Sequence, residues 1–104
     1  MTDIELRPLV RAFAEQMELA LRRNDHKESW RGMHPDDWGD MTRLEFVELE
    51  DEVALAYQYD GHDHERVTHE AADLAVCAMF AADNYGNLNV AHDGRGRAIA
   101  GGEE

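Results

Sequence analysis

The chain is short of cysteine and of long apolar runs, and each shortage excludes a class of protein. Cys77 is the only cysteine in 104 residues, so an internal disulfide and a thiolate metal cluster are excluded. No run of about 18 apolar residues occurs, so we expect no transmembrane helix. The N-terminus, MTDIELRPLV, lacks the basic and then apolar order of a signal peptide. We therefore expect a cytoplasmic protein in which Cys77 packs as a small apolar side chain.

Basic residues are also scarce. The 10 Lys and Arg residues stand against 23 Asp and Glu residues, which gives a formal net charge of −13. Such a surface repels nucleic acid and anionic membranes, so we expect neither as a partner. A nucleoside triphosphate would be repelled as well, unless divalent cations cancelled its charge locally. The alternative is that the acidity only keeps the chain in solution or suits a salty environment.

What the chain does contain is helical periodicity, which predicts an all-α fold. Apolar residues recur at steps of three and four over residues 5–23 and 42–59. A third helix is expected over residues 65–85, where nearly every central side chain is apolar, and it should end near Gly86. The D-G pair at 60–61 is a turn signal that would join the last two helices in antiparallel fashion.

Two segments lack this periodicity. Residues 24–41 form a polar connection, part of which could be a short helical turn that begins at Pro35, and connections of this length are often functional. Residues 87–104 are Gly-rich, so we expect a flexible tail or an arm that orders against a partner subunit. The domain is therefore expected to span residues 1–86 and, with a thin core, to gain from oligomerisation.

The strongest candidates for chemistry are two acidic pairs at helical spacing. Glu45 and Glu48 lie three residues apart, as do Glu70 and Asp73, so each pair shares one helix face. On two antiparallel helices the four carboxylates can converge. Alone they would repel one another, whereas a hard cation such as Mg²⁺ between them would turn the repulsion into binding.

The first pair also has an ordinary explanation. Thr42 and Glu45 form the T-x-x-E pattern of a capping box. Glu48 could be a solvated helix residue, and Glu52, one turn further on, offers a competing ligand. The second pair is harder to explain in this way. Asp73 is the only charged residue in its apolar stretch, and a buried carboxylate is costly without a partner or a metal.

Further candidates lie outside the two pairs. Asn84 returns to the face of Glu70 about four helical turns later. It could orient a phosphate, a sugar or a water, or it could simply end the helix. The H-D-H sequence at 62–64 is a loose chelating pattern. We expect the histidines to lie at the surface instead: His26, His34, His62, His64, His69 and His92.

The acidic motifs resemble those of a known family. The sequence E-x-x-E-L at 45–49, followed by E-A-A-D at 70–73, is similar to the paired motifs of MazG-type all-α nucleotide pyrophosphohydrolases. The N-D-H-K sequence at 24–27 with Trp30 behind it, and A-A-D-N at 81–84, are similar to small phage-type and bacterial members of that family.

The resemblance covers roughly residues 9–86 and implies a MazG-like helical bundle, completed by homo-oligomerisation as a homodimer or homotetramer. It implies hydrolysis of a nucleoside triphosphate to the monophosphate and pyrophosphate, with Mg²⁺ as cofactor and Mn²⁺ as a substitute. The alternatives are a catalytically silent helical module that dimerises, and a divalent-metal-binding protein without hydrolysis. The implied metal ligands are Glu45, Glu48, Glu70 and Asp73.

If the chain is such a hydrolase, the positions of other residues suggest catalytic and substrate-binding roles for them. Carboxylate-held Mg²⁺ would neutralise phosphate charge and lower the pKa of a bound water, whose proton Glu48 could take. Lys27, the only lysine, would reach the phosphates, unless it is an exposed cation at a helix end. Trp30 or Trp38 would stack on the base if the loop folds back over the site, with packing inside the loop as the alternative. The other expected substrate contacts are Asn24 and Asn84.

Overall fold

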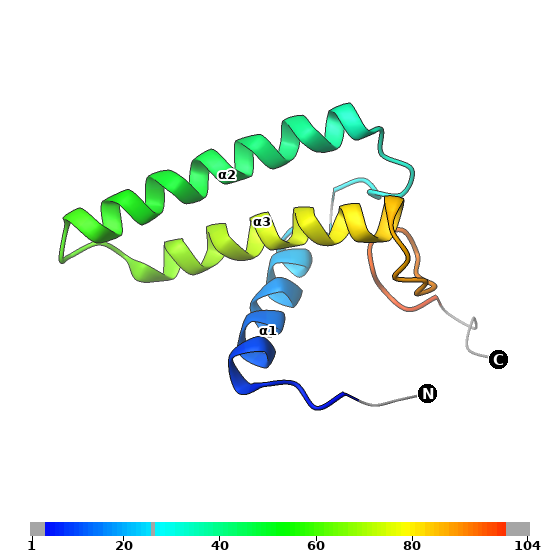
Figure 1. Cartoon of the computed structure of the whole chain (residues 1–104), viewed down its shortest axis with the longest axis horizontal. Helices are drawn as coiled ribbons and strands as arrows, with labels where there is room; N and C mark the ends of the chain where they lie inside the picture. Colours follow the sequence, from blue (N-terminus) through cyan, green and yellow to red (C-terminus); the bar gives the residue numbers. More distant parts are fainter. Residues whose placement is uncertain (1–3, 26, 100–104) are drawn as a thin grey trace.

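The structure, a computed structural model, describes residues 4–25 and 27–99. Within these residues it holds three α-helices and no strand, so the expected all-α fold is confirmed: α1 (Pro8–Arg23), α2 (Pro35–Gln58) and α3 (His64–Tyr85). The helices α2 and α3 form a long antiparallel hairpin, and α1 packs across α3 (Figure 1). In the described part of the chain, no helix has both the length and the apolar character that a bilayer crossing needs.

The limits of α1 follow from its terminal residues. The helix begins at Pro8 rather than at residue 5, because proline has no backbone N–H to lose and its fixed φ suits the first helical position. It ends at Arg23, and the backbone N–H of Asn24 closes the last turn on the carbonyl oxygen of Leu21, at 3.1 Å. Two arginines stand in this last turn, where a positive charge complements the helix dipole.

The expectation that the second helix begins at residue 42 is wrong. It begins seven residues earlier at Pro35, and the Nδ1 atom of His34 caps it by accepting the N–H of Asp36 at 3.0 Å. Thr42 therefore lies inside α2, where its hydroxyl donates to the carbonyl oxygen of Trp38 at 2.7 Å. Because Thr42 is not a cap residue, the capping-box explanation of Glu45 is excluded.

The hairpin between α2 and α3 agrees with its sequence signals. The side chain of Asp63 caps α3 by accepting the N–H of Glu65 at 3.0 Å. At the other end α3 stops at Tyr85, and Gly86 follows as expected, with its N–H bonded to the carbonyl oxygen of Ala82 at 3.1 Å.

The core is small and lies where α1 crosses α3. Ala20 and Ala72 are 1% and 0% exposed, and small side chains at a crossing let two helices approach closely. Val76 is buried beside them, and four partly buried apolar side chains pack around the three: Met17, Leu21, Met79 and Phe80.

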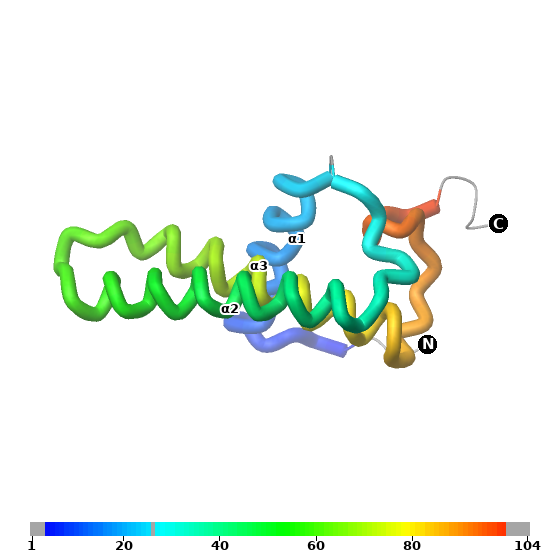
Figure 2. Tube along the Cα trace, turned by 90° about the horizontal axis from the view of Figure 1, so that it is seen from above, coloured from blue at the N-terminus to red at the C-terminus, as the bar shows by residue number. Residues whose placement is uncertain are grey.

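The segment after α3 is not a loose tail in its described part, residues 87–99. It folds back onto the loop between α1 and α2, and Figure 2 shows these two segments side by side. The carbonyl oxygen of Gly94 accepts both the backbone N–H of Trp30 (3.2 Å) and the hydroxyl of Ser29 (2.7 Å). The segment thus orders against its own chain. Residues 100–104 of the expected tail lie outside the described residues.

Asp83 in α3 joins the loop and this segment. Its Oδ2 atom accepts the indole N–H of Trp30 at 2.8 Å and lies 2.7 Å from Nε2 of His92. The bond from Trp30 and, after it, the contact with His92 lower the pKa of Asp83, although its partial burial opposes them. An ionised carboxylate that accepts two hydrogen bonds is therefore the anchor of both segments.

A test of this arrangement uses Gly94. Its φ of +92° is strained for any other residue, and an added Cβ would collide with the Ser29 side chain. We expect Gly94→Ala to destabilise the fold by at least about 1 kcal/mol. Amide hydrogen exchange should quicken in residues 92–97. The matched control is Gly61→Ala, because a Cβ at Gly61 meets no atom within 4 Å. Equal melting temperatures for the two variants would contradict the arrangement.

Candidate metal centre and adjoining cavity

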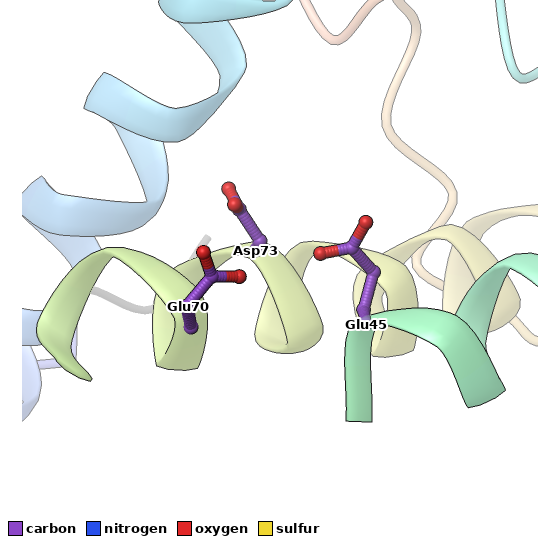
Figure 3. A group of neighbouring side chains, drawn as sticks. All are labelled: Glu45, Glu70 and Asp73. Atoms are coloured by element: carbon purple, nitrogen blue, oxygen red, sulfur yellow. The ribbon is translucent and has the colours of Figure 1, made fainter. Parts of the chain in front are cut away.

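Three of the four expected carboxylates converge. Glu45 comes from α2, and Glu70 and Asp73 come from successive turns of α3, and the three side chains face a common space (Figure 3). Each offers one carboxylate oxygen, and these oxygens all lie within 4.8 Å of one another. Oxygen ligands of Mg²⁺ stand about 2.1 Å from the ion, so this acidic triad could hold a metal ion.

The acidic triad is electrostatically strained without a cation. Burial, and then the charges of Glu48 and Asp73, raise the pKa of Glu45 to about 7. Burial and then Glu48 also raise the pKa of Glu70. One oxygen of Glu45 and one of Glu70 are buried without a hydrogen-bond partner among the described residues. Buried oxygens of this kind are costly, and a bound cation would relieve both the desolvation and the repulsion.

Glu48 is not part of the convergent group. Its side chain is exposed, although it lies close enough to raise the pKa of both Glu45 and Glu70. The expected site of four ligands is thus three convergent carboxylates with a fourth beside them. Such a position leaves Glu48 accessible to water, which a proton acceptor needs.

Glu52 is excluded as a competing ligand. It is 8% exposed, and both of its oxygens have partners: Nε2 of His62 at 2.7 Å and a guanidinium nitrogen of Arg66 at 3.1 Å. The contact also corrects the expectation that His62 lies at the surface. Asp63 is the cap of α3, so the H-D-H sequence is part of the hairpin turn rather than a chelate.

The other histidines also have local roles or exposed positions. His92 is buried, contrary to expectation, and faces Asp83. His34 caps α2, His64 is exposed, and His69 lies 3.9 Å from Glu65 on the same helix. His26 lies outside the described residues.

An arginine that the sequence analysis did not select contacts the acidic triad. A guanidinium nitrogen of Arg23, in the last turn of α1, lies 3.5 Å from Oδ1 of Asp73. The sequence does not reveal this contact, because helical periodicity does not say which neighbour will pack across the polar side of α1. Both side chains are partly exposed, so the pair contributes little to stability, but it places a cation beside the triad.

A cavity of about 190 Å³ adjoins the triad. Its polar lining comprises four acidic residues, two basic residues and one amide: Asp25, Glu28, Glu45, Asp73, Lys27, Arg95 and Asn24. The loop between α1 and α2 does fold back over the site, and it brings two of the expected substrate contacts, Asn24 and Lys27, to the cavity. The apolar part of the lining is Leu21, Met33, Met41, Val76 and Phe80.

The tryptophans are packing residues. Trp30 is 6% exposed, and its ring stacks on Phe80 with centroids 4.3 Å apart and lies 5.4 Å from the ring of His92. So buried a ring, already stacked on Phe80, leaves little of its surface for a base, although Trp30 also lines the cavity. The indole N–H of Trp38 donates to the carbonyl oxygen of Cys77 at 2.7 Å, which ties α2 to α3.

Asn84 does not reach the cavity. Its side-chain amide donates to the carbonyl oxygen of Trp30 at 2.8 Å and accepts the N–H of Gly32 at 3.2 Å. It holds the loop against the end of α3 through these two hydrogen bonds. The sequence pattern could not reveal these hydrogen bonds, because the loop residues that make them follow no periodicity.

Cys77 lines the cavity without a reactive thiol. It is 3% exposed, as expected for a small packed side chain. Burial, followed by the charge of Glu45, raises the pKa of its thiol to about 11, so the nucleophilic thiolate is suppressed.

The chain matches no family model, no curated protein and no solved structure. The chemistry open to the site follows from its own geometry. Oxygen-only ligands favour a hard divalent cation. The cavity adds Lys27 and Arg95, the carboxylates of Asp25 and Glu28, and an apolar wall, which together suit a ligand with a cation-bound anionic part and an apolar part.

The strain in the triad predicts a pH dependence. Because the folded pKa of Glu45, about 7, is raised from 4.5, its stabilising contribution is complete below about pH 4.5 and is lost as the pH rises through 7. Glu45→Gln cannot ionise. With EDTA present, its melting temperature relative to the wild type should therefore rise by several degrees between about pH 5 and pH 8.

Glu50→Gln is the control for this measurement, because Glu50 lies on the same helix with its side chain exposed. Its difference from the wild type should stay nearly constant with pH. Parallel pH profiles for Glu45→Gln and Glu50→Gln would show that Glu45 is not strained.

Proposed function

We propose that the chain is a nucleoside triphosphate pyrophosphohydrolase that depends on Mg²⁺ or Mn²⁺ and is related to the MazG-type enzymes it resembles. The products are the nucleoside monophosphate and pyrophosphate. The observation that carries the proposal is the adjacency of the acidic triad to a cavity that also contains Lys27 and apolar side chains.

The acidic triad explains how so acidic a protein could take an anionic substrate. With a net charge of −13, the chain repels free phosphates, and only a site that concentrates divalent cations reverses this locally. Mg²⁺ bound by Glu45, Glu70 and Asp73 would neutralise phosphate charge and lower the pKa of a coordinated water.

The protein's own groups would do the remaining work. Glu48, exposed beside the triad, is placed to accept a proton from the attacking water. Lys27 supplies a positive charge at the cavity wall, which stabilises the charge on the leaving phosphates. The apolar part of the cavity, which includes Met33, Met41 and Phe80, offers a surface for the base.

The size of the cavity favours a homo-oligomer. About 190 Å³ is less than the roughly 300–1,000 Å³ of typical small-molecule sites, so a nucleotide would extend beyond one chain. The outer face of α1 is apolar yet uncovered: Leu9 is 81% exposed, Val10 49% and Phe13 36%. A second copy packed on this face would bury these side chains, and a complete binding site would then draw on both chains.

The first test of this function is pyrophosphate release from each common ribo- and deoxyribonucleoside triphosphate in Mg²⁺. We expect turnover of at least one of them, and a loss in kcat/KM of about 100-fold or more in Glu70→Gln and Asp73→Asn, because removal of a metal ligand also misplaces the water. Glu50→Gln should keep full activity. No turnover of any substrate by the wild type would refute the hydrolase proposal.

A separate test addresses the metal without the chemistry. At a free Mn²⁺ concentration of 100 times Kd, binding should stabilise the folded protein by about 2.7 kcal/mol, seen as a rise in melting temperature. Asp73→Asn should abolish this rise, and Asp51→Asn, at an exposed position of α2, should retain it. Mn²⁺ stabilisation without hydrolysis would favour the non-hydrolytic metal-binding alternative, and the absence of both would favour a silent helical module.

A further inference from the structure

The segment after α3 brings a second positive side chain to the cavity. Arg95 lines it together with Lys27, Glu45 and Asp73. The Nε–H of Arg95 donates to the backbone carbonyl oxygen of Lys27 at 3.0 Å, although 68 positions separate the two residues. The tertiary fold thus brings the Arg95 side chain to the backbone of Lys27, and both residues line the same cavity.

The turn that carries Arg95 is well defined. The carboxylate of Asp93 accepts the backbone N–H groups of Arg95 (2.8 Å) and Arg97 (3.2 Å), and it pairs with the side chain of Arg97 at 2.8 Å. The backbone bond from Arg95, the largest of these effects, helps to lower the pKa of Asp93. Asp93 therefore neutralises Arg97, and Arg95 is the arginine of this turn that points to the cavity.

Buried groups fix the same turn to the rest of the fold. Nδ1 of His92 accepts the N–H groups of Gly94 (2.9 Å) and Gly96 (3.2 Å), the residues on either side of Arg95. Its Nε2 faces Asp83 of α3 at 2.7 Å. Backbone and buried contacts therefore hold Arg95 in place before a ligand arrives. Because the side chain is already ordered, ligand binding loses little conformational entropy at this residue.

The chemistry of the position suits phosphate. The bond to Lys27 uses Nε of Arg95, and the two terminal nitrogens of a guanidinium form a planar fork that matches phosphate oxygens. Lys27 and Arg95 line a cavity that also holds the carboxylates of Asp25, Glu28, Glu45 and Asp73. With a divalent cation on the acidic triad, these two basic residues would complete the charge pattern that a metal-bound polyphosphate requires.

We propose that Arg95 binds the phosphate chain of the substrate beside Lys27, so that the turn 92–97 is part of the substrate-binding site. This inference rests on the proposed function and extends it. It assigns a ligand-binding role to a segment whose sequence, Gly-rich and without periodicity, predicted a flexible tail.

The test is calorimetric binding of inorganic pyrophosphate in the presence of Mg²⁺ to the full chain. Arg95→Gln should weaken binding by about tenfold or more, because a charge-assisted hydrogen bond is lost. Arg95→Lys, which keeps the charge and loses the fork, should recover part of this loss. The control is Arg97→Gln in the same turn, which should bind as the wild type does. Mn²⁺ stabilisation should be unchanged in all three variants, since Arg95 is not a metal ligand.

Three outcomes would overturn the inference, and they can be told apart. Wild-type affinity in Arg95→Gln, with nucleotide hydrolysis intact in the wild type, removes the role of Arg95 and leaves the proposed function standing. A loss in Arg97→Gln as large as that in Arg95→Gln shows that both substitutions disturb the turn as a whole, and that the Arg95 side chain has no role of its own. If the wild type binds no pyrophosphate and hydrolyses no nucleotide, the inference and the proposed function fail together.

Discussion

The cavity beside the acidic triad depends on one carboxylate. Asp83 accepts the indole N–H of Trp30 from the loop before α2 and contacts His92 from the segment after α3. Neither segment has helical periodicity, and apart from the stacking of Trp30 on Phe80, hydrogen bonds hold both to the end of α3. Because both are fixed to the same turn of α3, they also bring Lys27 and Arg95 to one cavity. The triad itself needs only the hairpin of α2 and α3, whereas the placement of Lys27 and Arg95 in the adjoining cavity depends on Asp83.

Two glutamates of α2 show how the fold treats buried acids differently. Glu52 is the more buried, yet His62 and Arg66 satisfy both of its oxygens, so it holds the hairpin together. Glu45 is less buried, but one of its oxygens lacks a partner among the described residues and its pKa is raised to about 7. A buried carboxylate with a purely structural role usually has its charge balanced by other side chains of the protein. A buried carboxylate whose repulsion and desolvation a divalent cation would relieve is more typical of a ligand-binding site.

The sequence predicted the three helices and the hairpin well, and it missed features that depend on partners distant along the chain. The sequence pattern placed the start of α2 too late, because the first turns of this helix are polar and show no apolar periodicity. The only signal of its true start is Pro35, which follows the unusual cap residue His34. For Trp30 the sequence left open stacking on a base or packing inside the loop, and its ring is stacked on Phe80 of α3. Asn84 lies on the predicted helix, but its side-chain amide forms hydrogen bonds with the backbone of the loop between α1 and α2. Periodicity shows which side of a helix is polar and does not show which segment will cover it.

The sequence by itself determined the all-α fold and the two acidic pairs, since three-residue spacing puts side chains on one helix face wherever the helix lies. Only the tertiary structure decided that Glu45, Glu70 and Asp73 converge while Glu48 stays exposed, because convergence depends on how α2 rotates against α3. It also decided that Arg95 stands beside Lys27. A contact across 68 positions arises from hydrogen bonds between irregular segments, and these leave no repeating pattern in the sequence.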